Sequence, residues 1–437
     1  MDTTTATAYL GLIEKINSRL FSHDFMVRHR QTKKSFMRKR CLTFTILITF
    51  LLNMVKRSQQ DELDEFFKLL DGGQVAMRVV TKSAFTQARK HLKYEAFIEL
   101  NQVQIDYFYQ FLQPQTWHGL RLVAVDGSTV QVPNTPENLA HFGAWQPAKG
   151  GPCPMARISQ MFDVLNNVTL DALIVPKAFG ERDLAANHFA HLRPSDLVLL
   201  DRGYPAFWLF ALIVSKNAHF CARMKVSGWN AVEHFVASGL SEQLVILQPG
   251  YAACRDCRAR KLSTNPLTIR LIRVELDDGE VEVLATSLLD SKTYPISIFK
   301  ELYHLRWPVE EQYKVFKTRI EIENFSGKSV LAVYQDFHAK VFTANLTAIL
   351  ARPAQEVVTQ DSAEKKYCYQ INMTNALSKM KDTVVLLLHH LSSVPRLLNN
   401  LWQLMIKTIE PIRPGRSYPR IMRVKPKKFP VCYKPTR

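Results

Sequence analysis

Four residues between positions 303 and 317 have side chains suited to chemistry on phosphate. They are, at spacings of three, four and seven residues, Tyr303, Arg306, Glu310 and Lys317. On an α-helix, which turns about 100° per residue, these offsets fall within roughly 60° of one another and share one edge. Glu310 could then hold a divalent metal ion, while the other three side chains bind phosphate oxygens.

Pro308 divides this segment. Proline removes a hydrogen bond inside a helix but is favoured in the first turn, so a helix is predicted to begin near Pro308. Glu310 and Lys317 would lie on that helix. Tyr303 and Arg306 would come from the preceding segment, and the two segments would meet at a metal site. An ordinary amphipathic helix with an Arg306–Glu310 pair is the simpler alternative.

Two aspartates upstream could complete such a site. Asp126 follows the apolar run 121–125, and Asp201 follows the run 196–200. Side chains at strand ends project into the crevices where α/β sheets bind ligands, although a single aspartate there is more typical of a turn. If the strands are neighbours, the two aspartates and Glu310 supply three hard oxygen ligands for one or two Mg²⁺ ions. Two ions about 3.5–4 Å apart suit phosphoryl transfer.

The pattern of the chain predicts a mixed α/β fold. Residues 1 to about 115 have mostly helical periodicity, and strands begin near Gly119. A hairpin with its turn at Asn166-Asn167 is predicted, followed by a strand, a helix and a strand between residues 196 and 224. The segment 226–295 alternates like strands and predicts a β-rich insertion, after which the helical pattern returns.

The composition favours a polyanionic partner. The chain has 57 Lys and Arg against 39 Asp and Glu, a net charge of +18, which indicates nucleic acid first and a membrane surface second. Seven scattered cysteines indicate a reducing compartment, and the lone Cys254-x-x-Cys257 pair is weak evidence for a metal. The apolar run 41–55 is shorter than the ~20 residues of a membrane span, so it predicts a buried helix in a protein with no membrane partner.

Two basic segments could touch nucleic acid. Residues 81–92 predict a short basic helix, which could contact DNA or simply carry a solvated basic face. The tail 413–437 has nine Lys or Arg and no acid. It is expected to pack poorly and to adhere electrostatically to an anionic partner.

Three motifs together resemble those of a known family. They are Asp126-Gly127-Ser128, Asp201-Arg202-Gly203-Tyr204, and the Y-x₂-R-x₃-E-x₆-K pattern that starts at Tyr303. They resemble a DDE transposase, and more narrowly the fourth insertion-sequence family of cut-and-paste bacterial transposases. The resemblance covers about residues 30–437. It implies an RNase H-like catalytic core, with Asp126 on the first strand, Asp201 on the fourth, and the β-rich insertion before the helix of Glu310.

The resemblance also implies how such a protein works. Asp126, Asp201 and Glu310 would be catalytic and bind Mg²⁺, with two ions expected and Mn²⁺ able to substitute. A homodimer would hold the element's terminal inverted repeats in a synaptic complex. Water would release a 3′-OH, which attacks the opposite strand to form a hairpin; the hairpin is resolved before insertion into target DNA. Such a protein is expected in the bacterial cytoplasm, associated with the nucleoid.

Further residues have predicted roles in holding DNA. Tyr303, Arg306 and Lys317 would contact phosphate, as would Arg202 beside the metal site. Trp229, in the insertion, could stack on an extruded base, although a packed or surface tryptophan is the simpler interpretation.

The predicted organisation has five parts, and two alternative functions stay open. The parts are a helical DNA-binding region (1–115), the core's first part (116–225), the β-rich insertion (226–295), the core's second part with the Glu310 helix (296–375), and C-terminal helices with the basic tail (376–437). One alternative is an RNase H-like structure-specific nuclease, which would share the acids without strand transfer. The other is an inactive transposase-derived DNA-binding regulator.

Overall fold

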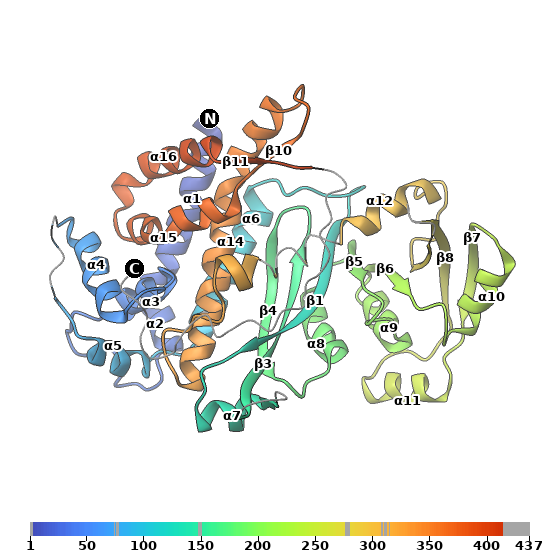
Figure 1. Cartoon of the computed structure of the whole chain (residues 1–437), viewed down its shortest axis with the longest axis horizontal. Helices are drawn as coiled ribbons and strands as arrows, with labels where there is room; N and C mark the ends of the chain where they lie inside the picture. Colours follow the sequence, from blue (N-terminus) through green and yellow to red (C-terminus); the bar gives the residue numbers. More distant parts are fainter. Residues whose placement is uncertain are drawn as a thin grey trace. The chain divides into compact units, whose positions relative to one another are not determined.

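The computed structural model of the chain (Figure 1) describes residues 3–73, 75, 78–146, 151–275, 280–306, 309, 313 and 315–413. The chain forms two compact units. Unit 1 comprises Met1–Pro114, Val130–Ala156 and Lys314–Arg437, and unit 2 comprises Gln115–Thr129 and Arg157–Tyr313. The five-part division stays a prediction. The basic tail lies outside the described residues apart from its first residue, Arg413.

Unit 1 is mainly helical. Its principal helices are α1 (Thr3–Leu20), α2 (His23–His29), α3 (Phe44–Leu52), α4 (Gln59–Asp71), α5 (Lys82–Arg89), α6 (Glu95–Phe111), α7 (Pro136–Phe142), α14 (Val330–Asp361), α15 (Met373–His389) and α16 (Val394–Lys407). The Ser329 hydroxyl caps α14 by accepting the Ala332 N–H at 3.2 Å. Helix α14 is buried along most of its length and packs against α3, α6, α15 and α16, so it forms the centre of this unit.

The apolar run 41–55 forms the buried helix that the sequence predicts. Helix α3 begins after Thr43, whose hydroxyl accepts the Ile46 N–H at 3.3 Å. Seven of its nine residues are buried, which explains its continuous apolar character without a membrane. No helix within the described residues combines the length and the apolar character that crossing a bilayer requires.

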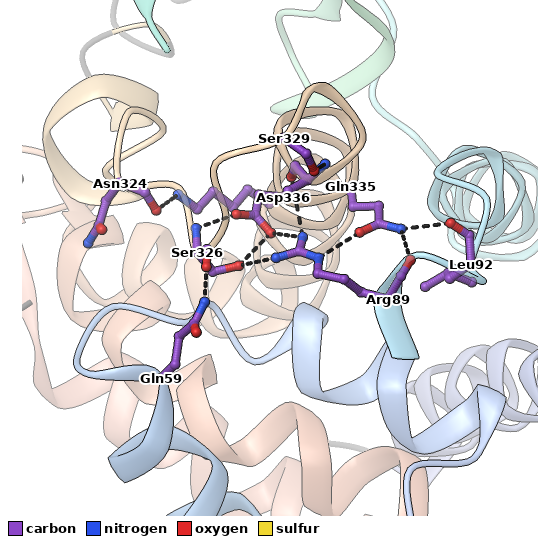
Figure 2. Close-up of polar contacts among 10 residues, drawn as sticks. Gln59, Arg89, Leu92, Asn324, Ser326, Ser329, Gln335 and Asp336 are labelled. Carbon is purple, nitrogen blue, oxygen red and sulfur yellow. Dashed lines mark hydrogen bonds and ion pairs between the residues drawn. The ribbon is translucent and has the colours of Figure 1, made fainter. Parts of the chain in front are cut away.

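The basic helix predicted at 81–92 is α5, and its basic residues are divided between solvent and the core of unit 1. Lys82 and Lys90 are exposed, as either interpretation of this segment requires. Arg89 is instead 4% exposed, and its guanidinium donates to Asp336 and Gln335 of α14 (Figure 2). Arg89 therefore belongs to the core of unit 1 and is not available to contact DNA.

Unit 2 is built on a mixed sheet. Its strands are β1 (Arg121–Gln131), β3 (Cys153–Asp163), β4 (Val168–Pro176), β5 (Asp196–Leu200), β6 (His219–Met224), β7 (Glu242–Leu247), β8 (Leu267–Glu275) and β9 (Val281–Thr286). Strand β4 pairs with β3, and the order continues β3-β1-β5-β6-β9-β8-β7. Strands β1, β5 and β6 are parallel, whereas β9, β8 and β7 are antiparallel to their neighbours. The first part of β3 and the end of β1 belong to unit 1, where β2 (Ala144–Trp145) pairs with β3.

This arrangement confirms the predicted mixed α/β fold class. The hairpin β3–β4 turns at Asn166-Asn167, where Asn167 adopts a left-handed φ of 56°. Strand β5, helix α9 (Phe207–Ser215) and strand β6 then form the predicted parallel crossover. Strand β1 lies between β3 of the hairpin and β5 of the crossover, so it joins the two motifs in one sheet.

Two expectations about this sheet need correction. Strand β1 does not end at Asp126 but continues to Gln131, because the β-branched residues Thr129 and Val130 extend it. The insertion is less purely β than predicted, since it also contains helices α10 (Asn230–Ser238) and α11 (Tyr251–Ala259). Its strands extend the main sheet beyond β6 (Figure 1). The turn predicted at 277–279 lies outside the described residues.

Candidate active site

Asp126 lies on β1, and Asp201 directly follows the neighbouring parallel strand β5. The pairing of β1 with β5 runs from Arg121 opposite Asp196 to Ala124 opposite Leu199, a constant offset of 75 positions. Extended by two positions, the same offset brings Asp126 opposite Asp201. Adjacent strands lie about 4.8 Å apart and equivalent positions point to the same face, so this register predicts that the two side chains lie near one another. Both charges act on the Tyr204 hydroxyl, which supports this placement.

A buried ion pair fixes this register. Arg121, at the start of β1, donates from Nε and Nη2 to the two carboxylate oxygens of Asp196, at 2.8 and 2.6 Å. Both residues are at most 9% exposed, and the two-pronged geometry permits only one alignment of the strands. A slip of one residue would separate Arg121 from Asp196 and move Asp126 away from the level of Asp201.

The backbone of Asp126 has side-chain hydrogen-bond donors in addition to its place in a strand. Its carbonyl accepts the Tyr313 hydroxyl at 2.6 Å and the Ser159 hydroxyl at 3.3 Å. Its carboxylate accepts the N–H of the next residue, Gly127, at 2.8 Å. Burial raises the pKa of Tyr313 well above its ordinary value, and the Asp126 charge raises it further. Tyr313 therefore remains a protonated donor.

Tyr303 and Arg306 lie on the Asp201 side of the site. Tyr303 is in helix α12 (Phe299–His304), and its hydroxyl donates to Asp201 Oδ1 at 3.5 Å. The guanidinium of Arg306, which is 4% exposed, lies 5.8 Å from the centre of the Tyr303 ring. Burial raises the Tyr303 pKa; Arg306 opposes this shift and Asp201 adds to it. The tyrosine is thus a neutral donor beside a carboxylate.

The other two residues of the four-residue pattern are not placed in this group. Glu310 and Pro308 lie outside the described residues. Lys317 belongs to unit 1, in a short π-helix over Val315–Arg319. Within the described residues, no three His, Cys, Asp or Glu side chains assemble as a metal site. The third ligand therefore stays a prediction, while the two aspartates provide hard oxygen donors that suit a divalent cation.

Two residues without a predicted role border the aspartates. Glu181, at the start of helix α8 (Glu181–His188), lies against Gly127 and pairs with Arg157 at 2.8 Å. Tyr204 is 3% exposed, and its hydroxyl has no hydrogen-bond partner among the described residues. Burial raises the pKa of Tyr204 well above its ordinary value, with contributions from Asp126, Glu181 and Asp201. Tyr204 is the last residue of the Asp201-Arg202-Gly203-Tyr204 motif, and its position in that motif is the signal for its place beside Asp201.

Trp229 borders a cavity elsewhere in unit 2. It precedes α10, and its ring centre lies 6.1 Å from that of Phe210 in a tilted arrangement. The cavity has a volume of about 750 Å³, and its lining also includes Arg182 and Trp208. Arg182 donates from Nε to the carbonyl of Gly203, in the loop after Asp201. Arg202 in the same loop is exposed, as a phosphate contact requires.

The comparison with protein families decides the identity of the chain. A family model described as a transposase DDE domain matches residues 117–346, which span both aspartates and the four-residue pattern. The chain belongs to this family. The transposase is 23% identical over 406 residues to "Transposase InsG for insertion sequence element IS4" of Escherichia coli (strain K12), across 91% of this chain and 89% of InsG. It is also 26% identical over 155 residues to "Putative transposase InsZ" of the same organism, across 35% of this chain and 50% of InsZ.

The family match confirms the resemblance to DDE transposases that was drawn from the motifs. InsG belongs to insertion sequence element IS4, which agrees with the narrower resemblance to the fourth insertion-sequence family. The transposase is therefore a DNA-cleaving enzyme of the DDE type that depends on a divalent metal. Among solved structures, the piggyBac transposase synaptic complex with hairpin DNA matches 93% of this chain and 87% of that one. The TM-score is 0.44 and the identity 10%.

Proposed function

We propose that this transposase binds the terminal inverted repeats of its own element and excises it by a hairpin cut-and-paste route. The observation that carries the proposal is the register of β1 with β5, which, extended by two positions, brings Asp126 opposite Asp201. Adjacent strands lie about 5 Å apart, and carboxylates at equivalent positions of such strands suit two cations that bind one phosphate together. Glu310 is the third ligand in this proposal, and it would reach the pair from the segment after α12.

The three carboxylates would hold two Mg²⁺ ions, or Mn²⁺ in their place. When bound, the ions would activate the attacking oxygen and stabilise the leaving oxygen of the scissile phosphate. No covalent protein intermediate is needed, because phosphoryl transfer depends mainly on positioning and charge. Arg306 is buried beside the Tyr303 ring, which supports a fixed cation that grips phosphate on the Asp201 side.

Other residues in the proposal hold the DNA end. Tyr303 would donate its hydroxyl to a phosphate oxygen, while Arg202 and Lys317 would neutralise backbone charge. Trp229 would stack on a base extruded while the hairpin forms, and its place on the border of a large cavity supports this role.

The chain would act as a homodimer that joins both ends in a synaptic complex. Water would attack first and release a 3′-OH, which then attacks the opposite strand. After the hairpin is resolved, the freed end would insert into target DNA. A location in the cytoplasm, with the nucleoid, belongs to the same proposal.

The test uses purified protein, a duplex that carries the element's terminal repeat, and Mg²⁺. We expect hairpin ends on a denaturing gel, with Mn²⁺ able to replace Mg²⁺. Nicked product without hairpins or joined strands would instead support the structure-specific nuclease. DNA binding without any cleavage would support the inactive regulator.

Glu310→Gln tests the ligand that the structure does not describe. We expect this variant to lose cleavage while it retains binding to terminal DNA, since only the metal-binding charge is removed. Full cleavage by the variant would contradict the assignment of Glu310. Lys317→Ala should impair the reaction less completely and reduce the salt dependence of DNA binding.

A further inference from the structure

A serine, a histidine and an aspartate form a hydrogen-bonded chain in unit 2. His188 Nδ1, on α8, lies 2.7 Å from Asp171 Oδ2 on β4. His188 Nε2 lies 2.9 Å from Ser159 Oγ on β3. In hydrolases the same order of groups activates a serine nucleophile. Such a role would require Ser159 to be accessible to a substrate.

Burial excludes that role. Ser159 is 1% exposed and His188 is fully buried, so neither side chain can reach a substrate. A nucleophile needs an approach path for the atom that it attacks. These hydrogen bonds must therefore have a structural role, which is to hold another part of the protein in place.

The hydrogen bonds lead to Asp126. The Ser159 hydroxyl donates to the Asp126 carbonyl at 3.3 Å, on the strand next to its own. The His188 ring thus links Asp171 to Ser159, and the Ser159 hydroxyl is the last donor before the Asp126 carbonyl.

Tyr313 acts on the same carbonyl from another direction. Its hydroxyl donates to the Asp126 carbonyl at 2.6 Å, and Tyr313 follows Glu310 by three positions. Two donors from different segments thus fix one peptide group. That peptide leads directly into Gly127, whose N–H is bonded to the Asp126 carboxylate.

We propose that Asp171, His188 and Ser159 are positioning residues that, together with Tyr313, orient the Asp126 peptide so that its carboxylate faces the metal. This inference rests on the proposed role of Asp126 as a metal ligand. The three residues touch neither substrate nor cation. They act through the backbone of a ligand, as outer partners of metal sites do, and the removal of such partners costs about 10- to 100-fold in metal affinity or activity.

The experiment compares Ser159→Ala with the matched control Thr169→Val. Thr169, on β4, is also a fully buried hydroxyl, and it donates to Gln160 at 3.1 Å. Each variant loses one buried hydroxyl, so both should lose comparable stability to urea. Binding of Mn²⁺ to the protein without DNA is measured by electron paramagnetic resonance, and the Mg²⁺ concentration for half-maximal cleavage is measured separately.

We expect Ser159→Ala to weaken Mn²⁺ binding about tenfold and to raise the Mg²⁺ requirement by a similar factor. Thr169→Val should leave both unchanged. Ser159→Thr, which restores a hydroxyl, should recover much of the loss. Equal metal affinity in Ser159→Ala and Thr169→Val would overturn the proposal.

Asp126→Asn separates this failure from failure of the proposed function. If Asp126→Asn abolishes Mn²⁺ binding and Ser159→Ala does not weaken it, the positioning role is wrong and the metal site stands. If Asp126→Asn binds Mn²⁺ like the unchanged protein, Asp126 is not a ligand, and both proposals are wrong.

Discussion

The Arg89–Asp336 cluster of unit 1 and the Asp171–His188–Ser159 hydrogen-bonded chain of unit 2 both bury polar side chains. Their hydrogen bonds have different consequences. In the first, each guanidinium nitrogen of Arg89 donates: Nε to Gln335 at 2.9 Å, Nη1 to Ser326 at 2.9 Å and Nη2 to Asp336 at 2.8 Å. The Asp336 carboxylate also accepts the N–H and the hydroxyl of Ser326, and the Gln59 side chain donates to the Ser326 carbonyl (Figure 2).

The Arg89–Asp336 cluster is closed within unit 1, because each of these hydrogen bonds joins two residues of that unit. Gln335 donates back to the carbonyls of Arg89 and Leu92, at 2.9 and 2.7 Å. Burial alone would raise the pKa of Asp336, but the charges of Arg89 and Lys340 and the bonds from Ser326 outweigh it and lower the pKa. A closed cluster of this kind joins helices α5 and α14 across more than 240 positions of sequence.

The Asp171–His188–Ser159 hydrogen bonds in unit 2 lead instead to one site residue, Asp126. They begin at Asp171 and end on the backbone of Asp126, whose carboxylate is only partly buried. A closed network of buried polar groups thus stabilises the fold, whereas a network that ends on a partly exposed group positions that group. Substitutions in the two regions should therefore separate stability from activity.

The largest expected effect is on cleavage, from Asp201→Asn. Loss of one metal-binding charge should reduce the cleavage rate by at least about a thousandfold, or about 4 kcal/mol. The free energy of unfolding should change by less than about 0.5 kcal/mol, since Asp201 is partly exposed at a strand end. Single-turnover cleavage and urea titration measure the two effects. A variant that unfolds, or one that keeps a tenth of its activity, would break the comparison.

Arg89→Ala should produce the converse result. Removal of Arg89 leaves the Asp336 charge buried without its main partner, which should cost about 3–5 kcal/mol of unfolding free energy. Lys90→Ala, at the exposed neighbouring position, is the control and should stay within about 0.5 kcal/mol. Mn²⁺ affinity of the folded fraction should be unchanged in both variants. A loss below 1 kcal/mol for Arg89→Ala would show that the cluster contributes little to the fold.

His389 gives unit 1 a sensitivity to acid. Burial, with help from the neighbouring His390, lowers the pKa of His389 from 6.5 to about 4, and its Nε2 lies 3.0 Å from the Thr49 hydroxyl. Between pH 6.5 and 4 the unfolded chain binds a proton that the folded chain does not, so stability falls as the pH falls. His389→Gln should remove on the order of 2 kcal/mol of this pH dependence, with allowance for partial exposure. Parallel stability curves for the two proteins, from urea titrations across this range, would contradict the assignment.

The smallest expected effect comes from Tyr303→Phe. The hydroxyl lies at 3.5 Å from Asp201, the outer limit of a hydrogen bond, so its contribution to Asp201 should be below about 1 kcal/mol. We expect cleavage to slow only a few-fold, with an unchanged free energy of unfolding. A loss as large as that of Asp201→Asn would contradict this small contribution, since one neutral hydrogen bond, to Asp201 or to a DNA phosphate, cannot account for it.

Local patterns in the sequence were enough to predict the mixed α/β fold class and the DDE transposase family. The spacing of Tyr303, Arg306, Glu310 and Lys317 is a local pattern, and the apolar runs before Asp126 and Asp201 identify strands through hydrophobicity alone. The buried helix α3 and the hairpin at Asn166-Asn167 could be predicted for the same reason, since each depends on residues close in sequence.

Contacts between residues far apart in sequence could be known only from the tertiary structure. The alignment of Asp126 with Asp201 depends on the Arg121–Asp196 pair, and nothing in a linear pattern specifies an offset of 75 positions. The burial of Arg89 could not be predicted either, because its partners Gln335 and Asp336 lie on a helix far along the chain. Sequence periodicity records which side of an element is apolar. Pairing between buried polar groups is set by the packing of elements, and that depends on the whole fold.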